Sequence, residues 1–432
     1  MRTQIVLEPL RGQTRFAPLG VLGYCLTRTG FLQPVWSQVH CGMKTYQHQP
    51  TEKLQDMLTS ILAGNQSLAQ INTRIRPDRP LAAAWDRACF AEQSSVARTL
   101  DGLTEEQVEQ LQQGSQALFR QHARTMQHNF EQHWLVIDID PTHLPAARSA
   151  PGSHTHYVNG KKNQSGRWWN RISVPTYHET LFSQLYPGNW QACQMLKPDL
   201  LRIQEFLKLS LAQRKRTIVR SDASLGTDGN INHLLWADYQ VLMKGFSGSR
   251  AAKLGKQVAD EDWLEDPVRK RWIAWAPDPP RFARRTQVFS LRWRNRSTWR
   301  YGTLVSSLLD LEPAAALRLH DGRGAVEVEI KADKQGLKAS HRRKKSFEAQ
   351  AGLILLTDLA HNLLSWTHHW SLEGSPFEDF GTQRMVEELL CIPGRIVLKG
   401  PHLHKVALLQ SHPYAADMRF VLVKLLDFFG NP

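Results

Sequence analysis

Two apolar segments that each end in an aspartate most constrain what this chain can fold into. The segment WLVIDIDPT, residues 134–142, stops at a proline and has Asp140 as its last acid. The segment RTIVRSDASLG, residues 216–226, carries Asp222 near its end and a glycine that closes the following turn. A carboxylate at the end of a core strand is costly to bury unless it is paired or binds a cation. The pattern therefore predicts two buried strands that deliver acids to one polar site.

The stretch HDGRGAVEVEIKADK, residues 320–334, adds a third acid. In a helix at about 100° per residue, Arg323, Glu327 and Lys334 lie within about 40° of one another, whereas Glu329 points roughly 160° away from Glu327. For an arbitrary helix, a solvated face with salt bridges is the simpler explanation of this spacing. The two upstream aspartates favour the other interpretation, in which Glu327 completes a site for hard metal ions.

The spacing in this stretch resembles the Tyr-x2-Arg-x3-Glu-x6-Lys signature of insertion-sequence DDE transposases, enzymes with an RNase H-like catalytic core. Arg323, Glu327 and Lys334 match the last three positions of the signature. The Tyr position is His320 in this chain, so the role of that side chain stays open. The resemblance covers about residues 134–366 and implies a DNA transposase.

The same resemblance assigns roles to the strand-end aspartates. Asp140, in the tripeptide DPT, looks like the first catalytic Asp of such enzymes, and Asp222, in RSD, looks like the second. Asp138 lies on the same strand face as Asp140 and is the alternative first acid. It ranks second because DPT, and not DID, matches the family spacing. The resemblance thus implies that Asp140, Asp222 and Glu327 are the catalytic acids and the metal ligands.

The order of the predicted elements agrees with this resemblance. Three strands, a helix, a strand, a helix and a strand follow one another over about residues 134–245, which is typical of an RNase H-like sheet. In that fold the first strand is central and the fourth lies beside it, which would make Asp140 and Asp222 neighbours. We therefore expect an α/β fold: an RNase H-like mixed sheet flanked by helices, with a β-rich insertion before the Glu helix and an N-terminal helical domain.

This expectation divides the chain into five segments. They are a helical, DNA-end-binding region at 1–130, the first part of the catalytic core at 131–245, the β-rich insertion at 246–312, the second part of the core with the Glu helix at 313–370, and a C-terminal tail at 371–432.

The first segment has a mixed pattern. Residues 1 to about 50 show no clean period and are interpreted as an irregular arm, whereas helical spacing begins at Thr51. Short helices in front of a nuclease core could place a recognition helix in a DNA major groove. The candidate is EQSSVARTL, residues 92–100, with Arg98 as a DNA contact. A helical subdomain that only packs on the core is an equally good interpretation.

The interval between the second Asp and the Glu helix combines tryptophan with arginine. Its second half alternates in strand fashion, and Trp299 is the candidate DNA contact there. Aromatic and Arg side chains together suit stacking on unpaired bases and contact with phosphates. The alternative is that Trp293 and Trp299 form the buried face of a small sheet.

The residue types of the site favour phosphodiester chemistry. Oxygen ligands with open water positions favour two Mg²⁺ (or Mn²⁺) ions over Zn²⁺, and such an ion pair supports strand cleavage. Arg323 and Lys334 are expected to contact DNA phosphates that flank the scissile bond. Arg220, which alternates onto the strand face of Asp222, is a further candidate for DNA binding.

Composition supports a nucleic-acid partner. The chain has 54 Lys plus Arg against 40 Asp plus Glu, and a net charge of +14 favours a polyanion. No run of about 18 apolar residues exists, so no membrane partner is expected. The amino end lacks the features of a secretion signal, which predicts a cytoplasmic, nucleoid-associated protein. Five scattered cysteines predict neither disulfides nor a zinc ribbon.

The leading hypothesis is a DNA transposase that moves an insertion sequence by cut and paste, through metal-dependent strand cleavage and strand transfer. Its partners would be double-stranded DNA, as terminal inverted repeats and as target DNA, and by analogy a second copy of the chain in a homodimer on DNA. A catalytically inactive DNA-binding relative and a metal-dependent DNA nuclease are the alternatives.

Overall fold

The computed structural model describes residues 12–43, 47–158 and 161–432, without the side chains of residues 157–158 and 325–329. By its internal packing the chain divides into two compact units. The sheet unit comprises residues 121–330, and the helical unit comprises residues 1–120 and 331–432. The roles predicted for the five segments stay predictions.

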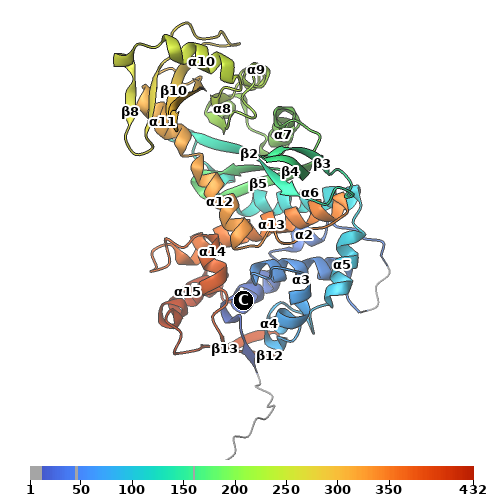
Figure 1. Cartoon of the computed structure of the whole chain (residues 1–432). Helices are drawn as coiled ribbons and strands as arrows, with labels where there is room; N and C mark the ends of the chain where they lie inside the picture. Colours follow the sequence, from blue (N-terminus) through green and yellow to red (C-terminus); the bar gives the residue numbers. More distant parts are fainter. Residues whose placement is uncertain (1–11, 44–46, 159–160) are drawn as a thin grey trace, which may run out of the picture. The chain divides into compact units, whose positions relative to one another are not determined.

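A mixed sheet of ten strands organises the sheet unit (Figure 1). The strand β2 (Leu135–Pro145) pairs antiparallel with β4 and parallel with β6, and β6 pairs parallel with β7. With β5 on the far side of β4, the order β5-β4-β2-β6-β7 is that of an RNase H-like sheet. The predicted central position of the first strand, with the Asp222 strand beside it, is confirmed. The prediction of three strands before the first helix is wrong, because β3 was missed. The other strands of this part are β3 (His154–Val158), β4 (Lys161–Val174), β5 (Glu179–Tyr186), β6 (Thr217–Ser221) and β7 (Gln240–Lys244).

The predicted β-rich insertion is confirmed, and it continues the same sheet. Its strands are β8 (Leu264–Asp266), β9 (Arg271–Trp275), β10 (Gln287–Asn295) and β11 (Thr298–Ser306). β11 pairs antiparallel with β7, so the insertion extends the sheet from the edge of the RNase H-like part. One core cluster joins Ile218 of β6 and Leu242 of β7 to Phe289 of β10. The insertion therefore shares a hydrophobic core with the strands that carry the aspartates.

Helices pack on the sheet and position its polar end. Helix α11 (Pro313–Asp321) contributes Ala316 and Leu317 to the same core cluster, so it lies across β6, β7 and the insertion. The remaining helices of the sheet unit include α7 (Ala192–Leu207), α8 (Leu211–Lys215), α9 (Asp228–Trp236) and α10 (Gly248–Gln257).

The single helix predicted over residues 320–334 is wrong in one respect. A turn at Gly322 and Arg323 separates α11 from α12 (Gly324–Gln335). A Cβ added at Gly322 would lie 2.8 Å from Nη1 of Arg220, so glycine leaves the room that this guanidinium occupies. Arg323 therefore precedes the helix of Glu327 and is not part of it.

The helical unit contains the α-helices predicted from Thr51 onward. The interpretation of residues 1 to about 50 as an irregular arm is wrong. Helix α1 (Ala17–Arg28) lies in this stretch, and every residue from Ala17 to Leu26 is buried. A helix surrounded by protein has no polar face, and so it gives no amphipathic period. Other elements are α3 (Pro50–Leu62), α5 (Gln93–Asp101), α6 (Glu105–His122), α13 (Phe347–Thr367), α15 (Ala415–Phe428), β12 (Gly394–Lys399) and β13 (His402–Leu408).

None of the helices in the described part of the chain combines the length and the apolar character that crossing a lipid bilayer requires.

A buried ion pair ties β2, β6 and α11 together. Arg220 Nε and Nη2 each donate to a different carboxylate oxygen of Asp138, at 2.7 Å, and Nη1 donates to the carbonyl oxygen of Leu319. Asp138 is fully buried and Arg220 is 4% exposed. A buried pair of this kind is strongly destabilising when one partner is removed, because the other charge is left uncompensated.

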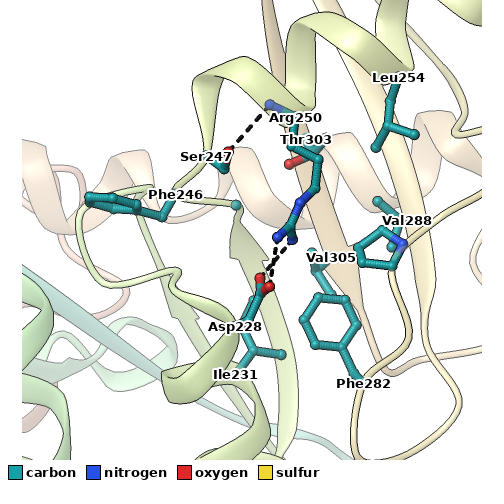
Figure 2. A pocket seen from close by; sticks show the side chains of 12 residues that line it. Asp228, Ile231, Phe246, Ser247, Arg250, Leu254, Phe282, Val288, Thr303 and Val305 are labelled. Carbon is teal, nitrogen blue, oxygen red and sulfur yellow. Dashed lines mark hydrogen bonds and ion pairs between the residues drawn. The ribbon is translucent and has the colours of Figure 1, made fainter.

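An exposed pair of the same chemistry lies elsewhere in the sheet unit (Figure 2). Arg250, on α10, donates from Nη1 and Nη2 to the two carboxylate oxygens of Asp228, on α9, both at 2.8 Å. The pair sits at the rim of a small pocket that Phe246 and Phe282 also line. Its side chains are 39% and 50% exposed, so water screens this pair.

Asp138→Asn should lower the free energy of unfolding by about 3–5 kcal/mol, because it leaves the guanidinium of Arg220 buried without its counter-charge. Asp228→Asn removes a carboxylate from the exposed pair and should cost less than about 1 kcal/mol. Chemical denaturation of both variants measures the difference. Equal losses in the two variants would contradict the structural role that burial gives to Asp138.

Candidate active site

Charged residues form a row where the parallel pairing of β2, β6 and β7 ends. The predicted end of the first strand at Pro141 is wrong, because β2 continues beyond Asp140 to Pro145 and stays paired with β4. Asp140 of β2 is paired in register with Arg171 of β4. In the parallel pairs, Ile139 matches Ser221 and Ser221 matches Met243, so the next residues along each strand are Asp140, Asp222 and Lys244. Neighbouring strands lie about 4.8 Å apart, which brings the two aspartates side by side. Their predicted proximity is therefore observed, and the row runs Arg171, Asp140, Asp222, Lys244.

Arg323 compensates the charge of the first aspartate. Its Nη1 donates to Oδ1 of Asp140 at 2.9 Å, and the side chains are 9% and 15% exposed. The turn that separates α11 from α12 directs Arg323 back to β2. The signature arginine thus meets a catalytic candidate, although it does so from a turn and not from the face of the Glu helix.

Asp222 is oriented by the turn that follows β6. Its Oδ1 accepts hydrogen bonds from the backbone N–H of Ser224, at 2.9 Å, and from Ser224 Oγ, at 2.5 Å. A short polar side chain bonded to its own turn in this way fixes its rotamer. Its other oxygen, Oδ2, accepts no hydrogen bond from any described residue and is available to a ligand.

His320, at the Tyr position of the signature, is buried against the same strand end. Its Nε2 lies 3.2 Å from the carbonyl oxygen of Ser221, the residue before Asp222. Burial, and then the nearby charges of Lys244, Arg323 and Arg220, lower the pKa of His320 to about 3. A neutral imidazole with its proton on Nε2 donates to that carbonyl, so His320 holds the end of β6 in place.

Two basic residues of the row were not predicted from the sequence. Arg171 is fully buried in β4, and Lys244 ends β7. Burial and the charges of Arg323 and Arg271 lower the pKa of Lys244, against the opposite effect of Asp321 and Asp222. The segment YQVLMKG carries the signal that could have found it, because it is an apolar strand that ends in a charge, like the two aspartate strands.

The third predicted acid, Glu327, lies in α12, and its side chain is outside the described residues. Among the side chains that the structure describes, no group of three His, Cys, Asp or Glu is placed to hold a metal ion. The two adjacent aspartates are hard oxygen donors, which fit Mg²⁺ or Mn²⁺ better than Zn²⁺. Lys334 is half-buried near the end of α12.

Arg220, predicted to bind DNA, is engaged in the buried pair with Asp138. Its guanidinium is 4% exposed and has little surface to offer a phosphate. The same pair involves both oxygens of Asp138, the alternative first acid, whereas Asp140 lies one residue beyond the last pair between β2 and β6.

Trp299 lies in a cluster of tryptophan and arginine on the insertion. The guanidinium carbon of Arg292 is 4.8 Å from the ring centre of Trp299, and that of Arg294 is 5.0 Å away. Arg292 also lies 4.5 Å from Trp263 and 5.9 Å from Trp272. The cluster combines a buried tryptophan, Trp263, with a half-buried one, Trp299, and an exposed arginine, Arg294. The cluster therefore matches neither interpretation fully: it is not a completely buried sheet face, and its aromatic rings are already covered in part by arginine side chains.

Arg98 is exposed on α5, in the helical unit. Lys344, which is not part of α5, donates hydrogen bonds to this helix, to Ala97 O at 3.3 Å and to Asp101 Oδ2 at 2.9 Å. The exposed face of α5 is compatible with both interpretations of the N-terminal helices.

His320→Gln should change how stability depends on pH. Because the folded protein keeps His320 neutral down to about pH 3 whereas an unfolded chain protonates it near pH 6.5, the wild type loses stability through this residue as the pH falls below about 6.5. Glutamine keeps a donor for Ser221 and takes up no proton. Between about pH 6.5 and 4.5 the variant should therefore lose up to about 1.4 kcal/mol less per pH unit than the wild type. Chemical denaturation at several pH values measures this.

The exposed His402→Gln is the control and should follow the wild type. Parallel pH curves for wild type and His320→Gln would contradict the buried, neutral state of His320.

Comparison with known proteins identifies the family. Residues 37–428 match the family described as transposase DDE domain, group 1. A search of curated protein sequences finds no significant match. Among solved structures the chain is similar to piggyBac transposase in a synaptic complex with hairpin DNA, with a TM-score of 0.47 and 12% identity over 98% of this chain and 84% of that chain. Because the family match spans most of the sequence, the chain belongs to the DDE transposase family and is a DNA transposase.

Proposed function

We propose that this transposase moves an insertion sequence by cut and paste, through strand cleavage at the ends of the element and strand transfer to a target. The observation that carries the proposal is the adjacency of Asp140 and Asp222, each of which follows the last residue pair between β2 and β6. Two acids side by side at a sheet end are what a phosphodiester-cleaving site of this family requires.

Asp140, Asp222 and Glu327 would hold two Mg²⁺ or Mn²⁺ ions. When bound, such ions supply a hydroxide nucleophile at neutral pH and stabilise the leaving oxygen. The available Oδ2 of Asp222 and the position of Asp140 in the row support this donor set. The proposal for Glu327 rests on the signature spacing alone.

The other site residues would orient the acids and the DNA. Arg323 compensates the charge of Asp140 and is close enough to meet a phosphate that enters beside it. Lys334 would bind phosphates that flank the scissile bond. His320 donates to Ser221 and so keeps Asp222 in register with Asp140. Arg220 acts through its pair with Asp138 and supports β2 and β6 from within.

DNA recognition would extend beyond the acids. Arg98 is proposed to contact the terminal repeats from α5, and Trp299 to stack on an unpaired base at the cleaved end. Arg292 and Arg294 both lie against the Trp299 ring. Arg292 is also paired with Asp260 at 2.9 Å, so the base would displace the exposed Arg294 and not Arg292. Two element ends must be held together, so a homodimer on DNA at the nucleoid is part of the proposal.

One experiment separates a transposase from a nuclease and from an inactive relative. Purified protein is incubated with linear DNA that carries the element's own ends, in Mg²⁺. Joined products indicate a transposase, cutting without joining indicates a nuclease, and binding without cutting indicates an inactive relative.

Asp140→Asn, Asp222→Asn and Glu327→Gln should each reduce strand cleavage by at least about 10³-fold, because each removes a charged ligand of the proposed ions. DNA binding in the absence of Mg²⁺ should stay close to that of the wild type. Cleavage rates and gel-shift affinities measure both properties. Asp228→Asn, an exposed acid in the same unit, is the matched control. If one of the three variants cleaves DNA as fast as this control, the assignment of that residue to the catalytic site is wrong.

Trp299→Ala should weaken binding to element ends with unpaired bases by about 5- to 150-fold, since stacking of one base on an aromatic ring contributes about 1–3 kcal/mol. Binding to fully paired ends should change little. Fluorescence of 2-aminopurine at the cleaved end reports the stack directly. Trp275→Ala, at an exposed tryptophan on β9 of the same insertion, is the control. An equal effect on paired and unpaired ends would mean that Trp299 only stabilises the insertion.

A further inference from the structure

Lys244 differs from three arginines near the aspartates, which are all paired with acids. Arg323 is paired with Asp140, and Arg220 with Asp138. Arg271, on β9, is paired with Asp266 and Asp321. The ammonium group of Lys244 forms no hydrogen bond or ion pair with any residue that the structure describes. The N–H donors of the Lys244 ammonium group are therefore available to a ligand.

The position of Lys244 is fixed by the backbone. It follows Met243, which is in register with Ser221, so it lies beside Asp222 in the row. The turns after β6 and β7 are joined, because Phe246 N–H donates to Gly226 O at 2.9 Å. A Cβ at Gly226 would lie 1.8 Å from the carbonyl oxygen of Lys244, so only glycine allows the two turns to approach this closely. Lys244 and Asp222 are therefore held together.

The environment of Lys244 favours an anion. The side chain is half-buried, and a buried ammonium without a partner is costly. Burial and the neighbouring Arg323 and Arg271 lower its pKa, only partly opposed by Asp321 and Asp222, while His320 beside it is neutral. An anion that enters between Asp222 and the insertion would pair with the ammonium and offset this cost. In a DNA transposase, the anion that reaches the carboxyl end of the sheet is a DNA phosphate.

We propose that Lys244 binds a phosphate of the DNA strand held at the Asp140–Asp222 pair, on the side of that pair that faces the insertion. The inference rests on the proposed function, because it assumes that DNA is cleaved at these aspartates. Within the sheet, β7 is the last strand of the RNase H-like part and pairs with β11 of the insertion. The bound phosphate would therefore lie where the DNA strand passes from the acids toward the insertion. Lys244 is thereby a substrate-binding residue that the signature does not contain.

The alternative is that Lys244 only balances the charges of Asp222 and Asp321 within the fold. A phosphate contact and an internal balance of charge differ in one respect. A contact is lost when one particular phosphate becomes neutral, whereas an internal balance of charge does not depend on any phosphate.

The test replaces single phosphates with neutral methylphosphonates in a duplex that carries the element's own end, around the cleavage position. Binding is measured with Ca²⁺ in place of Mg²⁺, so that the duplex stays intact. The wild type should lose about tenfold in affinity at one or two modified positions. Lys244→Met should bind the unmodified duplex about tenfold more weakly, with a salt slope reduced by about one, and should be insensitive to the same modifications.

Lys256→Met, an exposed lysine on α10, is the matched control and should keep the wild-type pattern of sensitive phosphates. Lys244→Arg keeps the charge and should retain much of the affinity. A pH series on the wild type needs no variant: because the pKa of Lys244 is lowered, affinity should begin to fall at a lower alkaline pH than exposed lysines would give. This early loss should vanish with the duplex that carries the neutral phosphate.

The outcomes separate this inference from the proposed function. If the wild type does not cut the unmodified duplex in Mg²⁺, the proposed function is wrong. If the wild type cuts and Lys244→Met shows the same sensitive phosphates as Lys256→Met, the inference about Lys244 is wrong. If Lys244→Met does not fold, the pH series decides, and an equal alkaline loss with both duplexes overturns the phosphate contact.

Discussion

The cost of burying carboxylates on adjacent strands of the sheet governs this structure. β2 and β6 bring three aspartates to one region, and each acid is stable there only with a compensating partner. Asp138 receives Arg220 from the adjacent strand, and Asp140 receives Arg323 from the turn after α11. Asp222 is instead held by Ser224, through hydrogen bonds that leave one carboxylate oxygen available. The three acids thus differ in how their charge is compensated: Asp138 by a buried two-bond ion pair, Asp140 by Arg323, and Asp222 by hydrogen bonds from Ser224.

The break between α11 and α12 follows from the same requirement. Arg220 needs space beside the helix end, and Gly322 provides it because it has no Cβ. The chain turns there, and the next residue, Arg323, reaches Asp140. An unbroken helix would have placed Arg323 on the face of Glu327. In this chain the turn brings a cation to β2, and the helix that follows it, α12, carries Glu327.

The insertion is built as a continuation of the catalytic sheet. β11 pairs with β7, and a shared core joins both to α11. Arg271 of the insertion and Asp321 of α11 are also paired, which fixes the end of α11 next to His320. Movement of the insertion as a separate body would break this core. The Trp299 cluster and the row of charges therefore belong to one continuous sheet with a shared core.

The sequence by itself determined most strands and helices of the sheet unit, the strand-rich insertion and the strands that carry Asp140 and Asp222, whereas the central place of β2 was implied by the family resemblance. The strands, the helices and the insertion depend on local periodicity along short segments, and the sheet order follows from the fold of the family that the motif spacing resembles. The tertiary structure alone decided that Arg220 is buried with Asp138, that Arg323 meets Asp140 and that Lys244 has no partner among the described residues. The two ion pairs join residues 82 and 183 positions apart, and no local pattern records them. The helix α1 escaped prediction for the related reason that burial on all sides erases the polar face by which helices are recognised.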